Sequence, residues 1–182
     1  MTMVPAGSNF IQVDASSVAV IALRADGSIV SWGNDIYGVI SGTPTGNDFV
    51  QVQIGITKGL ALKRDGSLVL WGDGSPSWPN WMETPEGTGF EQISLGYGFA
   101  LALRADGSIV SWGNTYTYED LFAPTGTDSV QVSAPLSMGQ SGGFRLSLRA
   151  DGTIYSWFRG GFGDDSTTTA GVYHASNSGY HA

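Results

Sequence analysis

Cysteine is absent from this chain of 182 residues, and histidine occurs twice, at His174 and His181. The absence of cysteine excludes disulfides, thiol catalysis and cysteine metal sites. Both histidines stand in the C-terminal tail, outside every repeat described below, where a general base would have no fixed frame. We therefore expect a protein that is not an enzyme and that has no metal site and no cofactor.

Positive charge is scarce, with eight Lys and Arg residues against 16 Asp and Glu and a formal net charge of −8. Half of the basic residues occupy one repeated position, at Arg24, Lys63, Arg104 and Arg149. Nucleic-acid binding needs a basic patch that neutralises phosphates, so we expect no nucleic-acid partner. No apolar run approaches the roughly 18 residues of a membrane span, so we expect no membrane insertion.

The N-terminus also lacks the charged and apolar regions of a secretory signal. The body of the chain is nevertheless rich in Ser, Thr, Gly and Asn and contains two lysines, a composition common in proteins that face the outside. Virion proteins reconcile the two observations, because they are made in the cytoplasm and exposed later. The compartment stays open, with an extracellular or virion-surface location favoured over a cytoplasmic one.

The chain is dominated by an internal repeat. The thirteen residues ALRADGSIVSWGN occur twice without change, from Ala22 and from Ala102, and weaker copies begin at Ala61 and Ser147. The tryptophans near the ends of the four copies are Trp32, Trp71, Trp112 and Trp157. They stand 39, 41 and 45 residues apart, and a period of about 40 is typical of propellers and solenoids.

Each copy predicts a β-hairpin. An Asp-Gly pair, Asp26-Gly27 in the first copy, lies between two apolar runs and favours a type I′ turn, in which both turn residues have positive φ. The runs are apolar on both faces, as in strands sandwiched between neighbouring sheets. A Pro-x-Gly turn and a short F-x-Q-V strand open each unit. No segment has a helical period, so we expect an all-β chain.

These motifs resemble the regulator-of-chromosome-condensation repeat family, and more closely its compact bacterial branch, which includes beta-lactamase-inhibitor protein II. The resemblance is carried by the A-L-x-x-D-G-S-x-V-x-W-G-N core at residues 22–34, 61–73 and 102–114. It extends over about residues 4 to 160. The resemblance implies a β-propeller of four-stranded blades.

The family usually has about seven blades, whereas this chain has four units. We expect a single domain, 1–182, that forms an incomplete ring, closed by self-association or capped by the C-terminal tail. In the second case, Val172 to Tyr180 would lie against the rest of the protein or a neighbouring subunit. The expected divisions are units 4–42, 43–83, 84–122 and 123–160, followed by an irregular tail, 161–182.

Most repeated residues are interpreted as structural. The four repeated aspartates fit the hairpin turns, and the repeated tryptophans fit packing between blades. The repeated glutamines, Gln12, Gln51, Gln92 and Gln131, are expected to tie strands or turns through side-chain hydrogen bonds. In the fourth unit, six additional residues around Ser133 to Gly143 predict a private loop.

The segments after each Trp-Gly pair do not repeat and are rich in aromatic residues, the composition of a protein-binding surface. The candidate partner-binding residues are Tyr37, Trp78, Trp81, Tyr116, Tyr118 and Phe122. Trp78 and Trp81 are the expected anchors because prolines stiffen their loop. The alternative is that these aromatic residues cover blade edges.

We therefore expect a non-catalytic module that binds a protein partner through aromatic loops on one rim of a propeller. The alternative function is a virion or cell-surface component that is structural or binds glycans. Self-association is expected as well.

Overall fold

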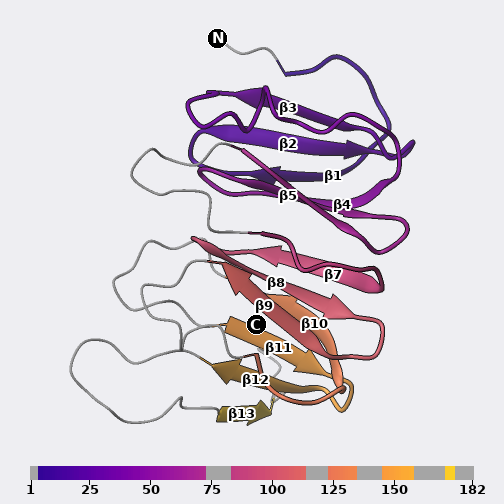
Figure 1. The fold of residues 1–182 in the computed structure, drawn as a ribbon, viewed down its shortest axis with the longest axis vertical. Coiled ribbons are helices and arrows are strands. Elements are labelled where there is room, and N and C mark those ends of the chain that lie inside the picture. The colour runs from indigo at the N-terminus through magenta and orange to yellow at the C-terminus, as the bar shows by residue number, and fades with distance from the viewer. Residues whose placement is uncertain (1–3, 73–82, 114–122, 135–144, 158–170, 175–182) are drawn as a thin grey trace, which may run out of the picture.

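The computed structural model describes residues 4–72, 83–113, 123–134 and 145–157, and the backbone of residues 171–174 (Figure 1). Within these ranges the chain forms strands and turns and contains no helix. The prediction of an all-β chain built from repeated hairpins is therefore confirmed.

The strands form four antiparallel sheets, in which strands adjacent in sequence pair with each other. We call the sheets blades 1 to 4. Blade 1 contains β1 (Phe10–Ala15), β2 (Ala19–Arg24) and β3 (Ile29–Gly33). Blade 2 contains β4 (Phe49–Ile54), β5 (Gly59–Lys63) and β6 (Leu68–Trp71). Blade 3 contains β7 (Phe90–Leu95), β8 (Phe99–Arg104) and β9 (Ile109–Gly113). Blade 4 contains β10 (Ser129–Ser133), β11 (Arg145–Arg149), β12 (Thr153–Trp157) and β13 (Gly171–His174).

The hairpin turns differ from the predicted type I′. The Gly27 N–H donates to Arg24 O at 2.9 Å, and Gly27 has a φ of 85°. Asn9 is the one described residue other than glycine with positive φ, so Asp26 has negative φ and the type I′ prediction is wrong. The geometry is a type I turn followed by a glycine bulge. Asp26 suits it because its Oδ1 accepts bonds from the Ser28 N–H (2.9 Å) and hydroxyl (2.7 Å).

Successive blades enclose apolar clusters, which together form the core. Between blades 2 and 3, Leu60 and Leu62 of the middle strand β5 meet Phe90 and Ile93 of β7, and all four side chains are at most 3% exposed. Strands covered on both faces in this way explain the apolar runs of the sequence. We call each such contact between successive blades a blade joint.

The repeated tryptophans pack into these joints. Trp71, Trp112 and Trp157 are 8%, 8% and 3% exposed and belong to the clusters between blades 1 and 2, 2 and 3, and 3 and 4. A buried indole contributes a large apolar area. The prediction that these tryptophans pack between blades is confirmed. Trp32, in blade 1, has no preceding blade and is half-buried.

The repeated glutamines cross the blade joints. Gln51 Nε2 donates to Ile93 O (3.1 Å), while Gln51 Oε1 accepts from the Ile93 N–H (2.8 Å). Gln12 makes the same pair of bonds with Val52, both at 2.9 Å. Gln92 Oε1 likewise accepts the Val132 N–H at 2.9 Å. The prediction that the repeated glutamines tie strands together is therefore confirmed for Gln12, Gln51 and Gln92.

A second side chain, two residues after each glutamine, adds another bond across the joint. Asp14 Oδ2 accepts the Ile54 N–H (2.8 Å), Gln53 Oε1 accepts the Leu95 N–H, and Ser94 Oγ accepts the Ala134 N–H (2.8 Å). Because strands alternate their side chains, both groups project from the same face of the first strand.

Among the described residues, blade 4 has a fourth strand, β13, which pairs antiparallel with β12 and sets Tyr173 opposite Ile154. Residues 34–42 of the first unit form turns in place of a fourth strand. The part of the tail in β13 therefore lies against the rest of the protein, as expected, and extends the outer edge of blade 4. Residues 161–170 and 175–182 of the tail lie outside the described residues.

The four blades stack in chain order, and blades 1 and 4 lie at opposite ends of the stack (Figure 1). The arrowheads of β3, β9 and β12 point to the same side of the molecule (Figure 1). The segments that follow these strands therefore leave from one rim, which we call the loop rim. The Asp-Gly turns lie on the opposite side, the turn rim. The unit boundaries and the single-domain assignment stay predictions.

Candidate interaction surface on the loop rim

The structure describes one of the six predicted partner-binding residues, Tyr37. The other five lie outside the described residues: Trp78, Trp81, Tyr116, Tyr118 and Phe122. The loop predicted around Ser133 to Gly143 is described only at Ser133 and Ala134. The described part of the loop rim consists of the first post-Trp-Gly loop and the base of the second.

The first loop, residues 34–42, is held by its own aspartate. Asp35 Oδ1 accepts the Ile40 N–H at 2.7 Å, and both carboxylate oxygens lie within hydrogen-bond distance of the Ser41 N–H (3.2 and 3.1 Å). These bonds stabilise the charged carboxylate, and the pKa of Asp35 is lowered, first by the Ser41 side chain and then by the backbone donors. The loop closes on itself as a compact turn.

Val39 attaches this loop to the core. Its side chain is 0% exposed, and its carbonyl accepts bonds from Trp71 Nε1 (2.9 Å) and Thr43 Oγ1 (3.1 Å). Trp71 belongs to blade 2, so the following blade holds the loop of blade 1. Between the Asp35 and Val39 attachments lie Ile36, which is 63% exposed, and Tyr37, which is half-buried.

Ile36 was not among the sequence candidates. An exposed apolar side chain beside a half-exposed tyrosine, on a loop fixed at both ends, forms a small preorganised contact surface. Its sequence signal is the apolar residue in Asn34-Asp35-Ile36-Tyr37-Gly38, which aromatic content does not reveal.

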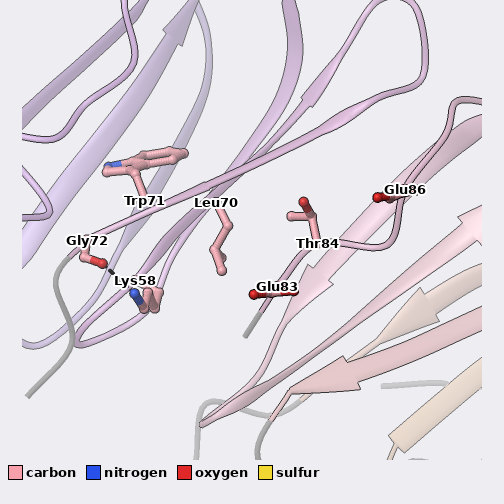
Figure 2. Close-up of a pocket in the computed structure, with 7 residues that line it drawn as sticks. All are labelled: Lys58, Leu70, Trp71, Gly72, Glu83, Thr84 and Glu86. Carbon is pink, nitrogen blue, oxygen red and sulfur yellow. Dashed lines mark hydrogen bonds between the residues drawn. The ribbon is translucent and has the colours of Figure 1, made fainter. Parts of the chain in front are cut away.

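A pocket of about 410 Å³ opens at the base of the second loop. Figure 2 shows that its lining comes from blade 2 and from the chain entering blade 3, namely Lys58, Leu70, Trp71, Gly72, Glu83, Thr84 and Glu86. Gly72 and Glu83 flank residues 73–82, which contain Trp78 and Trp81. The pocket therefore marks where the segment with the two predicted anchors leaves the blades.

The pocket combines apolar and charged groups. Leu70 and Trp71 supply apolar surface, and the carboxylates of Glu83 and Glu86 are exposed. Lys58 Nζ donates to Gly72 O, which ties the β4–β5 turn to the end of β6 (Figure 2). Such a mixed, open surface suits recognition of a polar partner.

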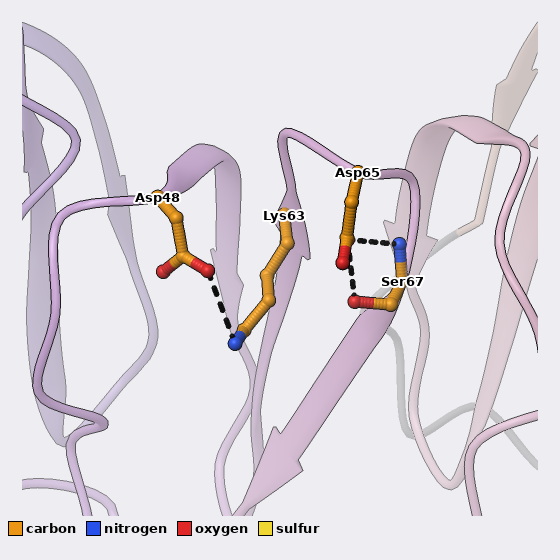
Figure 3. Close-up of polar contacts among 4 residues, drawn as sticks. All are labelled: Asp48, Lys63, Asp65 and Ser67. Carbon is orange, nitrogen blue, oxygen red and sulfur yellow. Dashed lines mark hydrogen bonds and ion pairs between the residues drawn. The ribbon is translucent and has the colours of Figure 1, made fainter.

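The repeated aspartates lie on the turn rim. Figure 3 shows Asp65 Oδ1 accepting bonds from the Ser67 N–H (2.9 Å) and hydroxyl (2.6 Å). These bonds, the hydroxyl bond first, lower the pKa of Asp65 below its ordinary value. The equivalent serine bonds lower the pKa of Asp26 and Asp106. The aspartates are structural turn residues, as interpreted from the sequence.

The repeated basic residues are also occupied within the blades. Lys63 Nζ lies 5.7 Å from the centre of the Phe49 ring and 3.1 Å from Asp48 Oδ2 (Figure 3). Arg104 stacks over Phe90 at 4.6 Å. Such cation–π contacts stabilise the strand ends.

The described residues include no group of three or more His, Cys, Asp or Glu side chains placed to hold a metal ion. No helix in the described part of the chain is long and apolar enough to cross a membrane.

Four antiparallel sheets stacked face to face through equivalent joints define the chain as a β-propeller repeat protein. Residues 90–116 match the family model for the regulator of chromosome condensation (RCC1) repeat. The match begins at the first strand of blade 3 and agrees with the resemblance that the sequence motifs implied. The closer likeness to the compact bacterial branch stays a prediction. No curated protein sequence matches the chain.

Solved structures share the fold. Human WBSCR16 aligns with a TM-score of 0.64 and 19% identity over 90% of this chain and 51% of its own. The ectodomain of the Arabidopsis thaliana receptor kinase ACR4 aligns with a TM-score of 0.62 and 21% identity over 84% of this chain and 51% of its own. Prp20p from Saccharomyces cerevisiae aligns with a TM-score of 0.62 and 19% identity over 85% of this chain and 47% of its own. Its structure is described together with its binding properties to Gsp1p and histones. The chain thus spans about half the length of these structures.

Proposed function

We propose that this chain is a non-catalytic interaction module that binds a protein partner through its loop rim. The observation that carries the proposal is the contrast between the two rims. The turn rim repeats the same aspartate and serine bonds, whereas the loop rim presents segments that differ in every unit.

The first loop supports the proposal through its rigidity. Asp35 and Val39 fix both ends of the segment that exposes Ile36 and Tyr37. A surface already held in its bound conformation loses less conformational entropy on binding. A tyrosine and an aliphatic residue on such a loop therefore suit a protein contact better than a role in folding.

The second loop supplies the expected anchors. Trp78 and Trp81 lie in the segment that joins the two sides of the pocket, Gly72 and Glu83. Tryptophan is among the residues that are most enriched in interface hot spots. Prp20p, which shares the fold, has described binding properties to Gsp1p and histones, so protein recognition is compatible with blades of this type.

The double variant Trp78→Ala/Trp81→Ala tests the proposal. A partner captured by the immobilised chain and identified by mass spectrometry would be purified and its Kd measured by calorimetry. We expect the double variant to weaken binding at least about tenfold, because truncating an anchor commonly costs about 2 kcal/mol or more. Its melting temperature should stay within a few degrees of the parent.

Val50→Ala is the matched control, because Val50 is 41% exposed and lies at the start of β4, near the turn rim. It should leave Kd unchanged. Unfolding of the double variant without selective loss of binding would show that the tryptophans pack within the fold. Binding of a glycan, and of no protein, on an array would replace the proposal with the alternative function.

A further inference from the structure

The three blade joints inside the chain share one construction. The leading blade contributes two polar side chains of its first strand, two aliphatic side chains of its middle strand, and the carbonyl of its Asp-Gly glycine. In the joint between blades 3 and 4, that carbonyl is Gly107 O, which accepts the Ser129 N–H at 3.2 Å. Gly27 and Gly66 bond Phe49 and Phe90 in the same way, both at 3.2 Å.

Blade 4 presents the same leading parts, and the described residues form no further blade against them. Gln131 and Ser133 repeat the Gln92 and Ser94 pair that clamps blade 4, and both are exposed. Leu146 is 38% exposed, whereas its equivalents in blades 1 to 3 are fully buried, namely Ile21, Leu60 and Leu101.

The Asp-Gly glycines show the same contrast. A Cβ on Gly107 would lie 2.3 Å from Thr127 O of the next blade, while a Cβ on Gly152 would meet nothing within 4 Å. We call the surface formed by Gln131, Ser133, Leu146 and Gly152 the leading face of blade 4.

Blade 1 presents the matching receiving parts. Val13 is 67% exposed, whereas its equivalents Val52, Ile93 and Val132 are at most 3% exposed. Phe10 is 36% exposed against 2% for Phe49. The Val13 backbone corresponds to the Val52 N–H and carbonyl that Gln12 binds across the first joint. Val13 and Phe10 mark what we call the receiving face of blade 1.

We propose that two copies of this chain join head to tail, the leading face of blade 4 of each copy docking on the receiving face of blade 1 of the other. Gln131 then binds the backbone of Val13 in the second copy, as Gln12 binds Val52 within the chain. Leu146 packs against Val13 and Phe10, and Gly152 O accepts the Phe10 N–H.

A second copy of the chain fits these surfaces, because the leading face of blade 4 and the receiving face of blade 1 carry the two complementary halves of a blade joint. Blades 1 and 4 lie at opposite ends of the stack (Figure 1), so one copy does not bring the faces together. Two equivalent joints related by a two-fold axis leave neither face exposed. The matched parts of human WBSCR16 and Prp20p make up 51% and 47% of those chains, so two copies supply a comparable length of propeller.

Sedimentation equilibrium of the 182-residue chain at micromolar concentrations tests this inference. We expect twice the chain mass of 19.1 kDa. Val13→Asp and Leu146→Asp should each yield a folded species of single-chain mass, because each places a carboxylate in an apolar joint. Unchanged far-ultraviolet circular dichroism and a cooperative melt would show that each variant is folded.

Val130→Glu is the matched control. Val130 is 52% exposed in β10, and the equivalent residue of blade 3 is an exposed glutamate, Glu91. This variant should keep the double mass. A single-chain mass for the parent protein, a mass above two chains, or a double mass retained by both aspartate variants would each overturn the head-to-tail pair.

Discussion

At the residue scale, one side chain often serves two blades. Gln51 makes two hydrogen bonds to the next blade while its own strand pairs with β5. Trp71 fills one joint and also bonds the loop of the preceding blade through Val39. This double use explains why glutamine and tryptophan recur in every unit while the loops beside them vary.

The turn aspartates predict a pH dependence. In Asp26, Asp65 and Asp106 the folded-state pKa lies below the ordinary value of 3.8, so folding favours the charged form. The contribution of these carboxylates to the free energy of unfolding is fully present above about pH 4 and is lost as pH falls through the folded-state pKa. Ser67→Ala removes the hydroxyl donor to Asp65 and should raise its pKa, measured by carboxyl NMR titration. An unchanged titration curve would contradict this prediction.

At the scale of the element, the sequence predicted hairpins, strand positions and the absence of helices. It did not predict the turn type, because the bonds from Ser28 to Asp26 favour negative φ at a position where Asp-Gly pairs often take positive φ. The sequence predicted packing between blades by Trp71 and its equivalents, and it predicted that the glutamines tie strands or turns, but it did not predict their partners. The glutamine bonds to Ile93 and Val52 join residues about 40 positions apart, which a period alone does not place in contact.

Two glycines with almost the same backbone separate turn strain from joint packing. Gly107 and Gly152 have φ of 80° and 83°. Gly152→Ala should destabilise the chain by about 1–2 kcal/mol, the cost of a left-handed non-glycine residue. Gly107→Ala should cost a further ~1–3 kcal/mol, the usual cost of overpacking, because its Cβ would lie 2.3 Å from Thr127 O. Urea unfolding measures both losses in the Val13→Asp background, where the head-to-tail joint is absent and a Cβ on Gly152 meets nothing within 4 Å; equal losses would show that blade 4 shifts to make room.

At the scale of the whole molecule, repetition leaves both ends of the stack with unsatisfied surface. The number of repeat units predicted such exposed ends. The identity of the exposed residues could not be predicted, because it depends on which face of each strand packs against the neighbouring blade. In the sequence, Val13 and Leu146 look like their buried equivalents Val52 and Leu101. In the structure, Val13 is 67% exposed and Leu146 is 38% exposed, whereas Val52 and Leu101 are fully buried. The candidate site was less accessible to prediction, since Ile36 and the pocket beside Glu83 depend on how non-repeated segments fold.

The outer edge of blade 4 gives the last prediction. The backbone of β13 pairs with β12 from Thr153 to Ser156, so ending the chain at Ala170 should expose four residues of the β12 edge. An unpaired edge is a template for association between chains. We expect the truncated protein to melt at a lower temperature and to form aggregates detectable by light scattering on heating. The blade joints use sheet faces, so the mass at low temperature should match that of the full chain. Unchanged melting and no added aggregation would show that β13 contributes nothing to blade 4.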